Sequence, residues 1–128
     1  MLNLIKMKYL IIVLISISTF GFTYQTSFSE TGKACYYANK FNGKKTSSGE
    51  VFSQENLTAA HKTLKLGTLV KVTNVANDST VIVKINDRLS KSSPYVIDLT
   101  LKAANRLNFV KNGFAKVKIE SITAPSAK

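Results

Sequence analysis

The stretch that decides the fold covers residues 81–88 and reads Val81-Ile82-Val83-Lys84-Ile85-Asn86-Asp87-Arg88. Its first five residues are rich in β-branched side chains, which favours a strand. The polar end of the stretch follows this apolar run directly. Side chains at a strand end lie at the rim of a sheet or barrel, where binding sites form. The stretch therefore predicts a strand that delivers Asp87 to such a rim, although a solvated turn residue would fit the same pattern.

Short β-rich runs recur on both sides of this stretch, separated by turn residues. They are residues 34–38, 69–73, 95–97 and 114–120, with a hairpin signal at Asn77-Asp78-Ser79. Thr100 is expected to cap a helix from Leu101 to Leu107 that stops at Asn108. A single helical turn is expected over Leu57–His61. This succession of strands favours an all-β fold, either a small closed barrel or a sandwich.

Length and composition limit the function. The chain has 128 residues, 45% of them hydrophobic, which suits one domain with one packed core. A single Cys and a single His exclude an intramolecular disulfide, a cysteine-rich zinc site and a paired-histidine metal site, so we expect no metal and no cofactor. The net charge of +11 is open to three interpretations, namely nucleic acid, an anionic envelope polymer or membrane, and a generic solvated surface.

The N-terminal segment has the pattern of an export signal. Lys6 and Lys8 precede the apolar run Tyr9–Phe22, which is too short for a typical spanning helix. An uncleaved anchor is the alternative, and either would place the domain outside the cytoplasm. Small residues around 19–21 or 27–29 suit cleavage. We expect a signal peptide and leader at 1–29, a barrel domain at 30–122 and a flexible tail at 123–128.

Cys35 has three possible roles. A lipid anchor is not expected, because Gly32 stands where a lipobox needs a large apolar residue. A nucleophilic pair with His61 is formally possible, and a small buried apolar residue is the plainer alternative.

Few carboxylates are candidates for chemistry. The chain has seven Asp and Glu in total. Glu30 lies near the expected cleavage site, and three others sit in turns, loops or exposed strand positions. Glu50, Asp87 and Asp98 remain, and each also has a plain structural interpretation, as does His61.

Several strings of the sequence together match one family pattern. They are Gly32-Lys33-Ala34-Cys35-Tyr36-Tyr37, residues 41–52, residues 57–64, residues 67–74, residues 83–88 and residues 96–100. In this order they resemble the rare lipoprotein A (RlpA) family over about residues 32–120. The sequence departs from the family where Leu89-Ser90 replaces a Gly-Pro pair and where Cys35 replaces the usual Ser.

The resemblance implies a six-stranded double-psi β-barrel and an endolytic lytic transglycosylase of the cell envelope or periplasm. Such a lyase cuts the β-1,4 bond between N-acetylmuramic acid and N-acetylglucosamine in peptidoglycan glycan strands and leaves 1,6-anhydromuramyl ends. The sugar's own C6 hydroxyl is the nucleophile, so one protonated carboxyl can serve where ordinary glycosidases need two. That carboxyl needs a raised pKa.

The resemblance also implies roles for individual residues. Asp87 matches the family's catalytic acid and His61 its supporting histidine. Glu50, Asp98, Arg88 and Tyr36 are expected to bind substrate or support the site. Asp98 is the second candidate for the acid, and it could instead raise the pKa of Asp87 by like-charge proximity.

The expected partner is the peptidoglycan glycan, met by a monomer without nucleic acid. A non-catalytic, expansin-like barrel that binds wall glycan is the alternative function.

Overall fold

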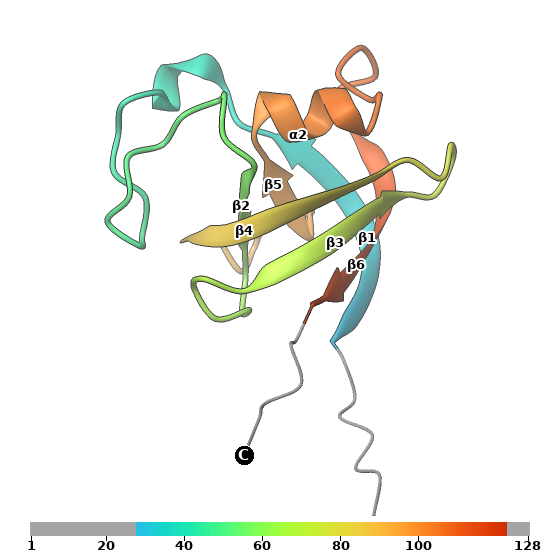
Figure 1. Ribbon diagram of the computed structural model, residues 1–128, viewed down its shortest axis with the longest axis horizontal. Helices are drawn as coiled ribbons and strands as arrows, with labels where there is room; N and C mark the ends of the chain where they lie inside the picture. The colour runs from blue at the N-terminus through green and yellow to red at the C-terminus, as the bar shows by residue number, and fades with distance from the viewer. Residues whose placement is uncertain (1–27, 123–128) are drawn as a thin grey trace, which may run out of the picture.

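Six strands close into a barrel in the computed structural model, which describes residues 28–122 (Figure 1). The order around the barrel is β1-β5-β2-β4-β3-β6. The elements are β1 (Ser29–Tyr36), η1 (Asn39–Phe41), β2 (Thr58–His61), β3 (Leu69–Asn74), β4 (Thr80–Arg88), β5 (Ile97–Leu99), α2 (Leu101–Arg106) and β6 (Ala115–Ser121). The expectation of an all-β barrel with one or two short helices is confirmed.

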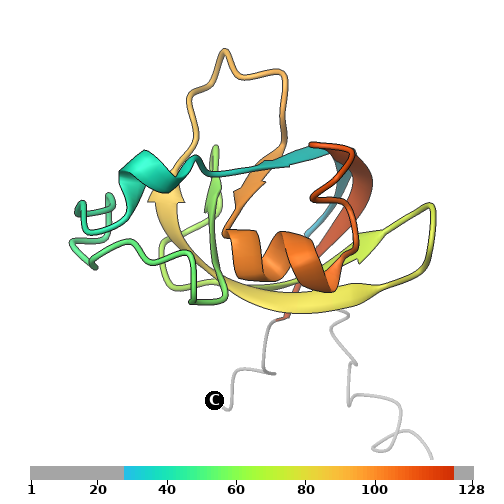
Figure 2. The same ribbon diagram turned by 90° about the horizontal axis from the view of Figure 1, so that it is seen from above.

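Both parallel and antiparallel pairs build this barrel. β1 pairs with β5, and β2 with β4, in parallel, whereas the other four neighbouring pairs are antiparallel. Parallel partners need a crossover connection. The connection from Tyr37 to Leu57 passes from β1 to β2, which are separated in the barrel by β5, and forms a long excursion beside β2 and β4 that carries η1 (Figures 1 and 2).

The core is apolar and continuous around the barrel interior. Alternate residues of β3, β4 and β6 are buried because successive strand side chains point to opposite sides of the wall. Helix α2 packs against β1 and β4 and contributes its buried face. The buried apolar residues include Val70, Val72, Val83, Ile85, Ile97, Leu99, Ala103, Ala104, Val117 and Ile119.

The helix signals at Thr100 and Asn108 are confirmed. The Thr100 hydroxyl accepts a hydrogen bond from the Ala103 N–H, and α2 begins at the next residue, Leu101. Asn108 has a φ of 56°, the left-handed conformation that stops a helix.

The expected helical turn at 57–61 is wrong, because β2 occupies Thr58–His61 instead. All four of its residues are buried, between β4 on one side and β5 on the other. Alanine favours helix locally, but two ladders of backbone hydrogen bonds outweigh that propensity here.

Strand β1 starts at Ser29, one residue before the start of the domain expected from the sequence, and the described chain starts at Phe28. The Phe28 N–H donates to the Ser121 Oγ, and Ser29 already pairs with Glu120. Residues 1–27 of the leader expected at 1–29, and the tail expected at 123–128, lie outside the described residues. Within residues 28–122, no helix is both long and apolar enough to cross a membrane.

Gly32 is required by close packing inside the barrel. It lies on the inner face of β1, opposite the buried Val117. A Cβ at this position would lie 2.4 Å from Cγ1 and 3.1 Å from Cγ2 of Val96. Valine is stiff about χ1, so its side chain cannot simply rotate away.

We therefore expect Gly32→Ala to lower the free energy of unfolding by about 1–3 kcal/mol, the usual cost of overpacking. The matched control is Thr31→Ala, at the neighbouring exposed position of the same strand. Urea unfolding of both variants measures the difference. Equal midpoints for the two would show that Val96 does not restrict this position.

Candidate active site on the outer face of the barrel

Two aspartates and a tyrosine meet on the outer face of the barrel wall. Ala60 in β2 pairs with Asp98 on one side and with Asp87 on the other. Residues directly opposite each other on neighbouring strands share a face, so both carboxyls lie on the face opposite the core. Their Cα atoms are two strand spacings apart, about 10 Å. Tyr37 reaches the same surface from the end of β1.

Asp87 is held by four hydrogen bonds. Its Oδ2 accepts from the Tyr37 hydroxyl at 2.7 Å. Its Oδ1 accepts from the Ser47 N–H at 2.9 Å, the Ser47 hydroxyl at 2.7 Å and the Arg88 N–H at 2.9 Å. Burial raises the pKa of Asp87, but these hydrogen bonds to the charged form outweigh it, and the net pKa is below its usual value. Asp87 is therefore the stronger acid of the two aspartates.

Asp98 has the opposite environment. Its Oδ1 is buried and has no hydrogen-bond partner in the part of the chain that the structure describes. Burial and, second, the negative charge of Asp87 raise the pKa of Asp98. Of the two carboxyls, Asp98 is therefore the weaker acid and holds a proton to a higher pH than Asp87 does. Of the two roles that the sequence left open for Asp98, the direction of this shift fits the acid rather than a group that raises the pKa of Asp87.

Tyr37 and Ser47 are the site residues that the sequence did not single out. Burial, followed by the hydrogen bond and charge of Asp87, raises the pKa of Tyr37 far above its usual value, so its hydroxyl remains a neutral donor. The Tyr37 ring packs on the buried Phe52, with centroids 4.3 Å apart. Buried Gln54 donates to the Tyr37 carbonyl at 2.7 Å and accepts from the Leu101 N–H at 2.7 Å, which ties this tyrosine to helix α2.

Two of the predicted site residues lie on the other side of the wall. His61 is 2% exposed and pairs with the buried Ile97, so its ring is inside the barrel. Its ring contacts are Glu30, the Thr63 and Leu64 N–H groups and the edge of Phe28, not Asp87. Tyr36 also points inward, where its hydroxyl donates to the Val110 carbonyl at 3.1 Å.

Glu50 and Arg88 support the site at its margin. The Glu50 carboxylate accepts from the Lys84 ammonium at 2.7 Å, which lowers the pKa of Glu50 and fastens the loop of Ser47 to β4. The Arg88 guanidinium donates to the His61 carbonyl at 3.0 Å, while its backbone N–H serves Asp87. Neither side chain contacts the Asp98 carboxyl.

Cys35 lies beside Asp98 rather than beside His61. It pairs with Asp98 across β1 and β5, is half-buried, and places its Sγ 3.6 Å from the Gly113 carbonyl oxygen. The nucleophilic pair with His61 is therefore not formed, and the interpretation as a fully buried apolar residue is only partly right. Over residues 28–122, no cluster of three or more His, Cys, Asp or Glu is arranged to hold a metal ion.

The arrangement suits acid–base chemistry. It places two carboxyls with pKa values shifted in opposite directions, and a neutral tyrosine hydroxyl, on a single face of the wall. Two carboxyls whose environments drive their pKa values apart are the usual basis for separate acid and base roles.

A model of the lytic transglycolase family matches residues 29–119. The chain is 50% identical over 105 residues to the endolytic peptidoglycan transglycosylase RlpA of Rickettsia bellii, which covers 80% of this chain and 46% of that protein. It is 46% identical over 95 residues to RlpA of Neisseria meningitidis, covering 74% of this chain and 40% of that protein. The chain thus spans less than half the length of these curated relatives.

Solved structures support the fold alone. Streptomyces papain inhibitor matches with a TM-score of 0.61 at 19% identity, over 75% of this chain and 96% of its own. A mutant expansin of Clavibacter michiganensis, in complex with cellohexaose, matches with a TM-score of 0.62 at 16% identity, over 79% of this chain and 54% of its own. Together with the family match, these confirm the expected double-psi type of barrel.

The two carboxyls should affect stability in opposite directions. Asp98 has a raised pKa, so its ionisation destabilises the fold as the pH rises through that pKa, and Asp98→Asn should raise Tm at pH 7. This gain should vanish below about pH 4, where Asp98 is protonated in both folded and unfolded states. Asp87 has a lowered pKa, so its carboxylate stabilises the fold at pH 7, and Asp87→Asn should lower Tm there.

Thermal unfolding from pH 3 to 7 measures both effects, and each variant controls for the other because the substitutions are isosteric. The assignment fails if both variants shift Tm at pH 7 in the same direction.

Proposed function

We propose a function for this chain on the premise that it belongs to the RlpA family of double-psi β-barrel lytic transglycosylases. The proposed function is cleavage of the β-1,4 bond between N-acetylmuramic acid and N-acetylglucosamine in peptidoglycan. The observation that carries the proposal is the pair of aspartates on the outer face, of which Asp87 has four hydrogen-bond donors and Asp98 a buried oxygen without a partner within residues 28–122. The pKa values of the two carboxyls are accordingly shifted in opposite directions. The relatives are endolytic peptidoglycan transglycosylases by name.

The proton movements follow from this pair. The Asp98 carboxyl donates its proton to the glycosidic oxygen as the bond to C1 of the muramic acid breaks. Positive charge develops on the sugar ring, and the Asp87 carboxylate stabilises it. The C6 hydroxyl of the same sugar then attacks C1, and Asp87 accepts the hydroxyl proton. The products are a 1,6-anhydromuramyl end and a free C4 hydroxyl, and water is not consumed.

Tyr37 and Ser47 prepare Asp87 for this role. Their hydroxyl groups hold both carboxylate oxygens, so the carboxylate is oriented before substrate arrives. Glu50 and Arg88 act through the loop and the strand end rather than on the sugar. The chain's 18 basic against 7 acidic residues suit an anionic, muramyl-bearing wall. The barrel acts as a monomer, and nucleic acid has no part in this function.

The test is cleavage of peptide-free glycan strands, with 1,6-anhydromuramyl ends detected by mass spectrometry. Wild type should form these ends, and Asp98→Asn and Asp87→Asn should each lose at least about 100-fold in rate, as expected for loss of a general acid or base. Asp78→Asn is the matched control, because Asp78 is an exposed turn residue between β3 and β4.

Other results would redirect the proposal. Full activity of Asp98→Asn would return the acid to Asp87. Strand binding without anhydro products, by wild type as well as by the variants, would favour the expansin-like function.

The same family membership leads us to propose export to the cell envelope, with removal of the N-terminal leader. Phe28 and Ser29 already bond to β6, so cleavage should occur before Phe28 and not after Ser29. Of the two sets of small residues, those around 19–21 fit this requirement. Mass spectrometry of the exported protein should find its first residue at or before Phe28. A mature chain that starts at Glu30 would contradict the proposal.

A further inference from the structure

We propose that Glu30 is a positioning residue for the cleavage reaction. It acts through His61 on strand β2, which lies between the strands of the two aspartates and pairs with both. The inference rests on the proposed function. Glu30 touches neither Asp87 nor Asp98 and is separated from them by the barrel wall.

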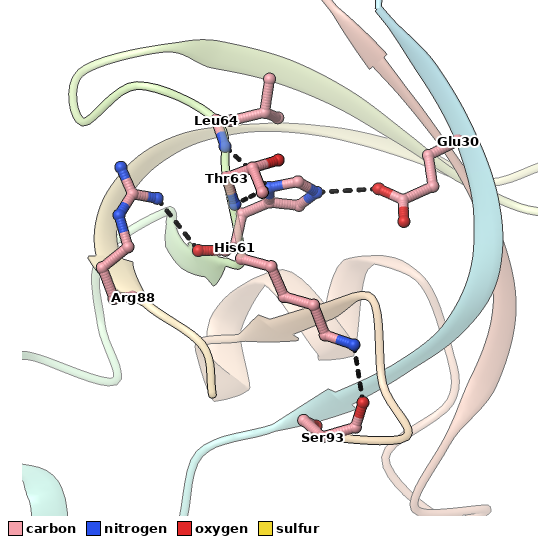
Figure 3. Close-up of polar contacts among 7 residues, drawn as sticks. Glu30, His61, Thr63, Leu64, Arg88 and Ser93 are labelled. Carbon is pink, nitrogen blue, oxygen red and sulfur yellow. Dashed lines mark hydrogen bonds and ion pairs between the residues drawn. The ribbon is translucent and has the colours of Figure 1, made fainter. Parts of the chain in front are cut away.

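The contact between Glu30 and His61 fixes the imidazole completely. His61 Nδ1 accepts from the Thr63 N–H at 3.1 Å and the Leu64 N–H at 3.0 Å, so it carries no proton. The ring proton therefore lies on Nε2, which donates to Glu30 Oε2 at 2.8 Å (Figure 3). A carboxylate acceptor makes this a charge-assisted hydrogen bond, stronger than a neutral one. With Glu30 in place, each ring nitrogen of the buried histidine has a partner.

This contact closes a gap in the barrel wall. Strand β5 separates β1 from β2, but it begins only at Ile97, which pairs with Ala34 of β1 and with His61 of β2. Glu30 lies four residues before Ala34, in the first part of β1, which pairs with β6 but not with β5. Before Ala34, none of the strands that the structure describes lies between the first residues of β1 and the end of β2. The hydrogen bond from His61 to Glu30 joins the two strands there.

The end of β2 that this bond holds is the part on which the active site depends. Ala60, directly before His61, is the backbone partner of both Asp87 and Asp98. The His61 carbonyl also accepts from the Leu89 N–H at 3.2 Å and from the Arg88 guanidinium at 3.0 Å. Movement of His61 would therefore shift the position of β2 against β4, and with it the spacing of the two carboxyls. Small displacements of reacting groups are costly to rate.

Glu120 provides a matched control. Its side chain is 34% exposed, the same as that of Glu30, and it lies on the neighbouring strand opposite Ser29. Within residues 28–122, its carboxylate forms ion pairs with the ammonium groups of Lys71 at 3.9 Å and Lys118 at 3.8 Å, and no ion pair with His61. Removing Glu120 thus deletes a carboxylate of equal exposure without touching His61.

The experiment compares Glu30→Ala, Glu30→Gln and Glu120→Ala in the glycan-strand assay. Glu30→Ala should lower kcat about 10- to 100-fold, by analogy with removal of the partner that orients a metal-bound histidine, with KM within about twofold of wild type. Glu30→Gln keeps an acceptor for the Nε2 proton and should recover most of the rate, and Glu120→Ala should match wild type. Recovery of the rate in Glu30→Gln without recovery of its thermal stability would exclude a purely structural role for Glu30.

The state of His61 is read separately, by long-range proton–nitrogen NMR without substrate. Wild type and Glu30→Gln should show the proton on Nε2, whereas Glu30→Ala should show altered imidazole signals. A proton on Nδ1 in wild type, or wild-type kcat for a folded Glu30→Ala, would overturn the inference. If Glu30→Ala does not fold, the His61 tautomer in wild type and the rate of Glu30→Gln test the inference instead. A rate for Glu30→Gln as low as that of His61→Ala would overturn the inference.

A wild type that cuts no glycan counts against the proposed function instead. The imidazole signals then still decide whether Glu30 holds the ring, because identical signals in wild type and Glu30→Ala would overturn the inference.

Discussion

A strand sends successive side chains to opposite sides of a barrel wall, and the rest of this structure depends on that separation. In β1, the inner face carries Glu30, Gly32 and Ala34, while the next residues alternate to the outer face and lead to Tyr37. In β2, Ala60 contributes to the outer site and His61 to the interior. The same wall is thus packed on one side and chemically active on the other. A one-residue slip in either strand would exchange the two sets of side chains, so the register that closes the barrel also assembles the site.

The second determinant of the site is the difference in hydrogen bonding between the Asp87 and Asp98 carboxyls. Asp87 has four hydrogen-bond donors from three residues, whereas the buried oxygen of Asp98 has none within residues 28–122. Burial and, second, the charge of Asp87 raise the pKa of Asp98, whereas the hydrogen bonds to Asp87 lower its pKa, so Asp87 ionises at a lower pH than Asp98 does. This asymmetry costs stability at neutral pH, since Asp98 is held where its ionised form is unfavourable. Such a cost is common where chemistry requires a shifted pKa.

Much of the fold could be predicted from the sequence, because β-branched runs, the Thr100 cap and the Asn108 stop are local signals. β2 could not, since Ala59 and Ala60 favour helix until β4 and β5 enclose them. For the site, the order of motifs identified the family and its acidic residues, but not which face each side chain occupies. Alternation from the small, apolar Ala34 could have assigned Tyr37 to the outer face. Nothing local indicated that Glu30, next to an export signal, would meet His61, because their contact depends on the barrel closing over long sequence separations.

The proposed acid and base roles require that, in the folded protein, the pKa of Asp98 lies above that of Asp87. The most direct test is a carbon-13 NMR titration of the two side-chain carboxyls in the wild-type barrel, assigned with the two Asp→Asn variants. We predict that Asp98 titrates above, and Asp87 below, the usual aspartate value of about 3.9. If Asp87 titrates above Asp98, or if both titrate at the usual value, the assignment of acid and base is contradicted.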